Sequence, residues 1–197
     1  MAYHTDSNSI YLFGGADEEG PKKDFYRYKI DEKTWEKLEV PEDVKALEMH
    51  TMEAWGKNKL LIIGGRSSEG VSKHIYKYDV KQNKWDLGFK KLPVPLCAHS
   101  SLMVGDFLYV VGGLAEQLLS DFIFKIDLVE KSSTRATFSD FEDKGVVQSK
   151  EMAGIMATNL AFCKKYNCFV LFGGSTLADE LDRILIIEMD KLEEKLE

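Results

Sequence analysis

The chain has 197 residues, of which 44% are hydrophobic and 30% charged, a composition that suits one soluble domain with a sizeable core. Its 26 basic and 33 acidic residues give a net charge of −7, and the lysines are scattered through predicted turns, so a general nucleic-acid binder is excluded. The apolar runs are too short to span a bilayer, and the N-terminus MAYHTDSNSI does not resemble a signal peptide, so no membrane partner is expected.

Four apolar runs along the chain each end in a pair of glycines, at intervals of 50, 48 and 61 residues. A strand without polar alternation is typical of a sheet that is covered on both faces. Glycines at its end permit positive φ and close backbone approach. The runs and pairs are residues 10–13 before Gly14 and Gly15, 60–63 before Gly64 and Gly65, 108–111 before Gly112 and Gly113, and 169–172 before Gly173 and Gly174.

A second set of strand-like runs follows the glycine pairs at a fixed distance. Tyr28, Tyr78, Ile126 and Ile187 lie thirteen residues after the second glycine, in runs 25–30, 75–80, 122–128 and 184–189. Seven residues further on are Trp35 and Trp85 in the first two repeats, but Ser133 and Glu194 in the others. Short strands at 51–55 and 100–104, preceded by His50 and His99, can form hairpins with the glycine-ended strands, as can the chain around 164–167.

One repeat therefore reads as strand, hairpin, strand, glycine pair, loop, strand, turn and strand, which are the four antiparallel strands of a propeller blade. Such a sheet cannot cover its own faces, so the repeats must stack. We predict four blades, at about 1–45, 46–95, 96–150 and 151–197, in a single domain spanning 1–197.

This pattern resembles the kelch repeat, which has a glycine doublet, a Tyr about thirteen residues later, then a Trp, with a period near fifty residues. Residues 74–85, HIYKYDVKQNKW, match the second half of that repeat closely, and the resemblance covers essentially the whole chain. It implies an all-β, kelch-type β-propeller. It also implies that His50 and His99 bond neighbouring backbone and lock the blade, the alternative being ligand contacts or proton donors at a channel mouth. His4 is read as a third copy of this histidine.

The resemblance also implies that the ring is incomplete, because kelch propellers usually have five to seven blades. We expect an open or partial ring, a C-shaped arc whose terminal blades expose Ile10, Leu12, Leu171 and Ile186 and associate with a partner chain or further sequence. Trp35 and Trp85 are expected to be largely buried beside neighbouring blades. The tail KLEEKLE favours a short helix or a frayed end, which leaves the fourth blade three-stranded.

The loops that follow the glycine pairs are the predicted binding surface, because rigid scaffolds recruit loops for recognition. Arg66 with Ser67 and Ser68 suits a carboxylate-bearing peptide, although a solvated loop is an equal alternative. Residues 134–158 form the longest connection, which is either functional or disordered. The remaining candidate loop residues are Asp17, Glu18, Glu116, Ser175 and Thr176.

We expect no metal and no cofactor. Cys163 and Cys168 can face each other across a hairpin, but Cys97 and His99 are the only further ligands at hand and follow no known zinc spacing, so buried, inert cysteines are the simpler interpretation. The glycine pairs match no phosphate-binding motif. Three cysteines without a secretory signal favour a reducing, cytoplasmic location.

These observations predict a protein–protein interaction scaffold or adaptor, not an enzyme. Two alternatives remain at this point. One is a propeller enzyme of the sugar-processing or oxidase type, although four scattered histidines do not supply a copper site. The other is a partial propeller completed by another chain.

Overall fold

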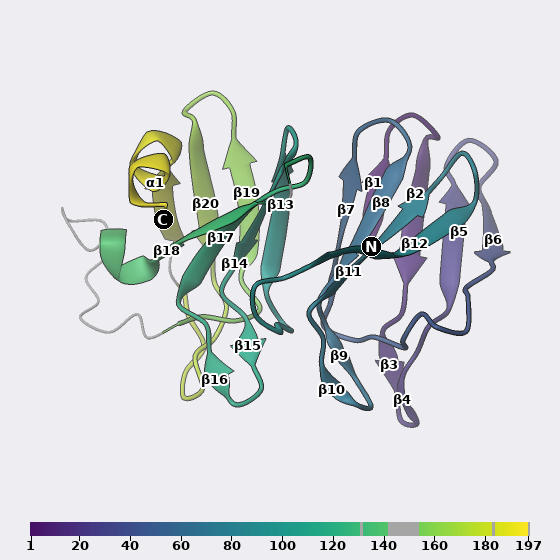
Figure 1. Cartoon of the computed structure of the whole chain (residues 1–197), viewed down its shortest axis with the longest axis horizontal. Helices are drawn as coiled ribbons and strands as arrows, with labels where there is room; N and C mark the ends of the chain where they lie inside the picture. The colour runs from purple at the N-terminus through teal and green to yellow at the C-terminus, as the bar shows by residue number, and fades with distance from the viewer. Residues whose placement is uncertain (131, 142–153, 183, 197) are drawn as a thin grey trace. The chain divides into compact units, whose positions relative to one another are not determined.

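The computed structural model describes residues 1–130, 132–141, 154–182 and 184–196, and almost all of its regular structure is β-strand (Figure 1). Four antiparallel sheets follow one another along the chain, which confirms the predicted all-β class and its four blades. The chain divides into two compact units, Met1–Cys97 and Ala98–Glu197, with two blades in each. No helix in the described residues is long and apolar enough to cross a membrane.

The first unit holds two four-stranded blades, and in each the strand before the glycine pair is central. Short two-stranded hairpins follow the glycine pairs and project from the same end of this unit (Figure 1). Blade 1 consists of β1 (Ala2–His4), β2 (Ser9–Phe13), β5 (Phe25–Lys29) and β6 (Thr34–Leu38), and its hairpin of β3 (Ala16–Asp17) and β4 (Gly20–Pro21). Blade 2 consists of β7 (Thr51–Trp55), β8 (Lys59–Ile63), β11 (His74–Asp79) and β12 (Lys84–Lys91), and its hairpin of β9 (Arg66–Ser67) and β10 (Gly70–Val71).

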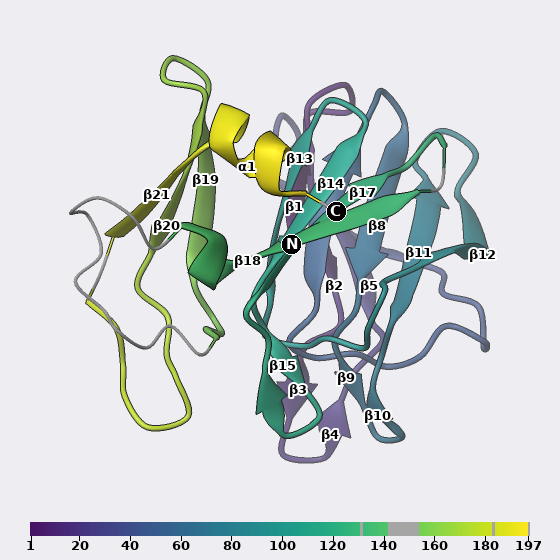
Figure 2. The same cartoon turned by 60° about the vertical axis from the view of Figure 1, so that its left-hand side comes forward.

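The second unit holds a four-stranded blade and a three-stranded one, and a short helix ends the chain (Figure 2). Blade 3 consists of β13 (Ser100–Val104), β14 (Phe107–Val111), β17 (Phe122–Asp127) and β18 (Ser133–Thr137), with a hairpin of β15 (Leu114–Ala115) and β16 (Leu118–Leu119). Blade 4 consists of β19 (Asn159–Cys163), β20 (Cys168–Phe172) and β21 (Ile184–Glu188), and is followed by α1 (Met189–Lys195). The helical tail and the three-stranded fourth blade were both predicted and are confirmed.

The long connection predicted at 134–158 is only partly irregular. Residues 134–137 belong to β18, which pairs with β17, and a 3₁₀ turn follows at Phe138–Phe141. The strand was missed because it carries no aromatic mark, yet Ala136 and Phe138 are buried in the core of this unit. Residues 142–153 of the predicted insertion lie outside the described part of the chain.

The core of the first unit is an aromatic cluster between blades 1 and 2. Phe13 and Phe25 from blade 1 face Trp85, with ring centroids 5.8 and 5.2 Å apart, and Tyr78 lies edge-on to Phe25 at 4.9 Å. The indole N–H of Trp85 donates to the Glu39 carbonyl at 3.2 Å. Trp85 therefore packs on the preceding blade, where it is partly buried.

Trp35, at the same repeat position in blade 1, was predicted to be buried and is not. It is 57% exposed, and its ring contacts Tyr28 and Tyr26 of its own blade, with ring centroids 5.0 and 6.4 Å apart. The physical reason follows from Trp85: this position packs on the blade that comes before it in the chain, and blade 1 has no such neighbour within its unit.

Two further predictions are corrected by the strand register. His4 pairs with Ser9 at the far end of β1, whereas the residue after His50, Thr51, pairs with Ile63 beside the glycines, so His4 is not a third copy. Leu171, predicted to be exposed, is buried against blade 3, because successive residues of β20 point to opposite faces. Leu12 and Ile186 are exposed, as predicted.

Candidate functional site

The second glycine of a pair ties its blade to the chain segment that follows. The N–H groups of Gly15, Gly65 and Gly113 donate to the carbonyls of Leu47, Leu96 and Ile155, at 2.9, 2.8 and 2.7 Å. Within the part of the chain that the structure describes, the N–H of Gly174 has no such acceptor. Each of the first three loops therefore begins at a glycine whose N–H is hydrogen-bonded to the chain segment that follows the blade.

The same glycines also close the loops. Their carbonyl oxygens accept the N–H groups of Lys22, Ser72, Ser120 and Leu181, each at 2.8 Å. In the first three blades the enclosed residues form the two-stranded hairpins, and in the fourth a bridge joins Ser175 to Glu180. Each predicted binding loop is thus an anchored hairpin with an exposed tip.

Ion pairs engage the acidic side chains on the hairpins of the first unit. Lys22 lies 2.8 Å from Asp17 and 3.0 Å from Glu19, and this lysine holds the pKa of Asp17 below its usual value. Lys45 pairs with Glu69 of the second hairpin. An incoming acidic group would have to displace carboxylates that are already bound.

The group of Arg66, Ser67 and Ser68 does not form three free donors. Both Nε and an Nη of Arg66 contact Oε1 of Glu48, at 2.9 and 2.8 Å. Ser67 is buried, and its hydroxyl donates to the Gly70 carbonyl, while Ser68 is exposed. The pairing with Glu48, eighteen residues away, was not visible from sequence because it depends on the bridge that brings Glu48 beside Arg66.

Apolar tips distinguish the hairpins of the second unit. Leu118 is 74% exposed and Leu177 is 67% exposed. Leu177 lies in the predicted fourth loop, whereas Leu118 was missed from the sequence. Glu116 is exposed with φ of 56°, Ser175 is held by backbone bonds to Met156, and the Thr176 hydroxyl accepts the N–H of Asp179 at 2.9 Å. A leucine at the tip of a loop is the signal that could have found this surface.

The two repeated histidines lie under the loops, away from their tips. The His50 ring contacts Phe13 edge-on at 5.5 Å. Burial lowers the pKa of His50 to about 4, although hydrogen bonds to the Phe13 and Leu47 carbonyls act in the opposite direction. The ring is therefore neutral at pH 7 and joins blade 1 to the start of blade 2. His50 is partly buried and His99 is buried.

Two of the three cysteines, Cys97 and Cys168, are buried, and Cys163 is partly buried. Cys163 and Cys168 face each other across β19 and β20, and burial raises the pKa of the Cys168 thiol. Cys97 is buried, and burial raises its pKa as well. Among the described residues, no three His, Cys, Asp or Glu side chains are placed to hold a metal ion.

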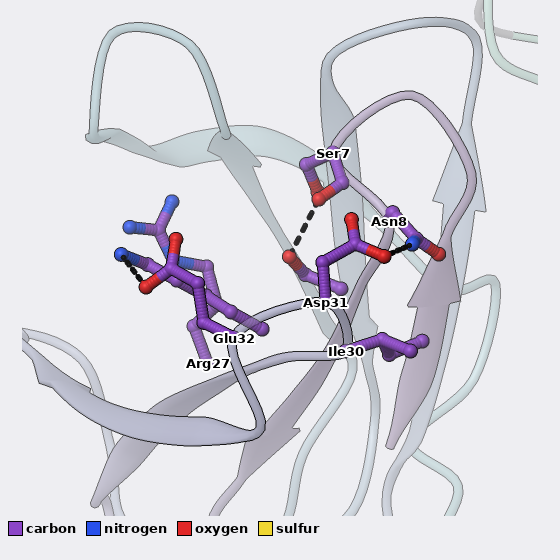
Figure 3. A pocket seen from close by; sticks show the side chains of 8 residues that line it. Ser7, Asn8, Arg27, Ile30, Asp31 and Glu32 are labelled. Atoms are coloured by element: carbon purple, nitrogen blue, oxygen red, sulfur yellow. Dashed lines mark hydrogen bonds and ion pairs between the residues drawn. The ribbon is translucent and has the colours of Figure 1, made fainter.

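A shallow hollow of about 170 Å³ lies at the opposite end of blade 1, between the β1–β2 and β5–β6 turns (Figure 3). Its polar groups pair with one another: Asn8 donates to Asp31 at 2.8 Å, and Lys29 lies 3.1 Å from Glu32. Arg27 is bound to Glu36. The hollow therefore has few unpaired polar side chains with which to bind a ligand.

Comparison with known proteins agrees with the repeat pattern. A search of curated proteins gives no match. The family model of the KLHDC2/KLHL20/DRC7 Kelch-repeats domain matches residues 1–174, which include all four glycine pairs. The predicted kelch resemblance and β-propeller fold are confirmed, and the chain belongs to this family of kelch-repeat domains.

Proposed function

We propose that the chain is a protein-interaction module that holds its partner with the hairpins that follow the glycine pairs. The observation that carries this proposal is the anchoring of the loops: in all four the glycine carbonyl accepts a hydrogen bond across the loop base, and in the first three the glycine N–H also donates to the next segment. A rigid base with variable tips is the arrangement that binding scaffolds use. Kelch-repeat domains are typically interaction modules without catalytic activity, which supports binding over catalysis.

The exposed tip residues set the chemistry of the partner. We assign the apolar contacts to Leu118 and Leu177, and the polar contacts to Glu18, Ser68 and Glu116. Arg66 is engaged by Glu48, and Asp17 by Lys22, so these two shape the hairpins more than they add free charge. Ser67 is buried. The proposed partner is therefore a protein with an apolar patch, not an acidic peptide.

Affinity capture from a cell lysate with quantitative mass spectrometry tests this role. The double variant Leu118→Ser/Leu177→Ser should lose at least about tenfold of the partner that the parent chain captures, because burying one leucine side chain contributes about 1.5–3 kcal/mol. Tyr166→Ser is the matched control, since Tyr166 is equally exposed but lies in the β19–β20 turn at the other end of its blade. Equal capture by all three proteins would contradict the proposal, as would a loss confined to Tyr166→Ser.

We also propose that the terminal blades associate with further protein. Blade 1 and blade 4 each expose large apolar side chains on one sheet face, including Trp35 and Phe172. Exposed apolar patches of this kind usually mark an interface.

A further inference from the structure

One face of the fourth blade is apolar and exposed. Phe172 and Ile184 are directly paired across β20 and β21, as are Val170 and Ile186. Phe172 is 54% exposed and Ile186 is 50% exposed, and Ile184 is exposed as well. These side chains share one face because residues two apart in a strand point the same way. The other face, with Phe169 and Leu171, is buried in the core of the second unit.

One face of the first blade is also apolar and exposed, and it is mainly aromatic. Trp35 pairs with Tyr28 across β5 and β6, and Ile10 pairs with Tyr28 from β2. Leu12 and Tyr3 are exposed on the neighbouring strands. Tyr11 and Phe13 alternate with these residues and point instead into the core of the first unit.

The contact between blades 1 and 2 shows how two such faces fit. Blade 1 presents Phe13, directly before its glycine pair, and Phe25, which pairs with Phe13 across the strands. Blade 2 presents Trp85, which pairs with Tyr78. Trp85 lies against both phenylalanines, and Tyr78 lies edge-on to Phe25.

The exposed faces of the terminal blades carry residues at the same repeat positions as the two sides of that contact. On blade 4, Phe172 directly precedes its glycine pair, as Phe13 does, and Ile184 pairs with Phe172 as Phe25 pairs with Phe13. On blade 1, Trp35 pairs with Tyr28 as Trp85 pairs with Tyr78. The chain thus carries residues of both sides of one blade–blade interface, and Trp35, Phe172 and Ile184 on these two sides are exposed.

We propose that a second copy of this chain fills them, with the blade 1 face of one copy packed on the blade 4 face of the other. Trp35 of one copy then lies against Phe172 and Ile184 of the other, as Trp85 lies against Phe13 and Phe25. The contact is head-to-tail, because the two faces are different. This inference rests on the proposed association of the terminal blades and does not involve the hairpin tips.

Two one-sided variants test the direction of the contact by sedimentation velocity. Trp35→Asp blocks the blade 1 face and Ile186→Asp blocks the blade 4 face, and both sites are exposed, so the fold tolerates the charge. The parent chain and the Tyr166→Asp control should self-associate at micromolar concentration. Each one-sided variant alone should sediment as a monomer. An equimolar mixture should give a heterodimer, since one intact face of each kind remains, and its formation also shows that both variants fold.

The outcomes separate the pairing from the association on which it rests. A parent chain that stays monomeric contradicts any association of the terminal blades with a second copy. A one-sided variant that still self-associates shows a face pairing with itself and overturns the head-to-tail contact, as does a mixture that stays monomeric. Capture of a partner through Leu118 and Leu177 is unaffected by these results.

Discussion

Glycine is required at the strand end by two effects that can be separated in this chain. Gly14 has φ of 61°, and a Cβ there would lie 2.3 Å from the Leu47 carbonyl oxygen. Gly56 has φ of 60° in the β7–β8 turn, but a Cβ there would meet nothing within 4 Å. The φ angle is nearly the same at both sites, and only Gly14 lies against the next segment of chain.

Replacing each of these two glycines by alanine therefore measures how much the positive φ angle and the close approach of the next chain segment each contribute to stability. Gly56→Ala should cost about 1–2 kcal/mol of unfolding free energy, which is the cost of a left-handed conformation for a residue with a Cβ. Gly14→Ala should cost at least about 1 kcal/mol more, because the backbone must also move to relieve an overpacked contact. Urea denaturation measures both, and equal losses would show that close approach is unimportant.

Protonation of His50 should weaken the fold in acid. Burial lowers its pKa from 6.5 to about 4 in the folded chain, so the unfolded state binds the proton more tightly. Stability is complete above pH 6.5 and falls as the pH drops toward 4, by at most about 3 kcal/mol from this group. His50→Gln should flatten the dependence of stability on pH in this window. An unchanged slope in denaturation at a series of pH values would contradict the assignment.

Single strands and turns show how far the sequence determines local structure. The strands before the glycine pairs, with Tyr11 and Tyr109, and the strands with Tyr28 and Tyr78 all form as predicted, because their patterns are local. The predicted burial is wrong for Trp35 and agrees with the packing of Trp85 on blade 1, because the burial of each tryptophan depends on which blade lies beside it. β18 was missed because its only mark, the burial of Ala136, depends on tertiary packing.

Trp85 should contribute strongly to the stability of the first unit. Trp85→Ala removes ring contacts with Phe13, Phe25 and Tyr78 and should cost about 3 kcal/mol, the lower end for loss of a packed aromatic side chain because Trp85 is only partly buried. Trp85→Phe keeps a ring in the cluster and should cost clearly less. Thermal or urea melts that show under 1 kcal/mol for the alanine variant would place Trp85 outside the core.

The C-terminal helix should stabilise the second unit in place of a fourth strand. Leu192 is fully buried, and Glu193 accepts a hydrogen bond from the Tyr109 hydroxyl at 2.8 Å. Burial, and after it this hydrogen bond, raises the pKa of Tyr109. Leu192→Ala should cost about 2–4 kcal/mol by leaving a cavity. Lys191→Ala, at an exposed site in the same helix, should change stability by less than about 0.5 kcal/mol. Equal effects in urea melts would mean that the helix is frayed.

At the scale of the whole molecule, the sequence predicts the repeat well and the binding surface only coarsely. Glycine spacing identifies where each loop begins, so the position of the hairpins could be predicted. The pairing of Arg66 with Glu48 and the burial of Ser67 could not, because both depend on hairpin geometry. The expectations of a single domain, of an open arc and of the loop residues as a binding site remain predictions.

The central claim is that the first three glycine pairs bond their blades to the chain segment that follows, and hydrogen exchange of the glycine amides, followed by NMR, tests it most directly. The N–H groups of Gly15, Gly65 and Gly113 donate to backbone carbonyls and should exchange slowly, as core amides do. The N–H of Gly174, which has no backbone acceptor in the described residues, should exchange much faster. Slow exchange at all four glycines, or fast exchange at the first three, would contradict the account.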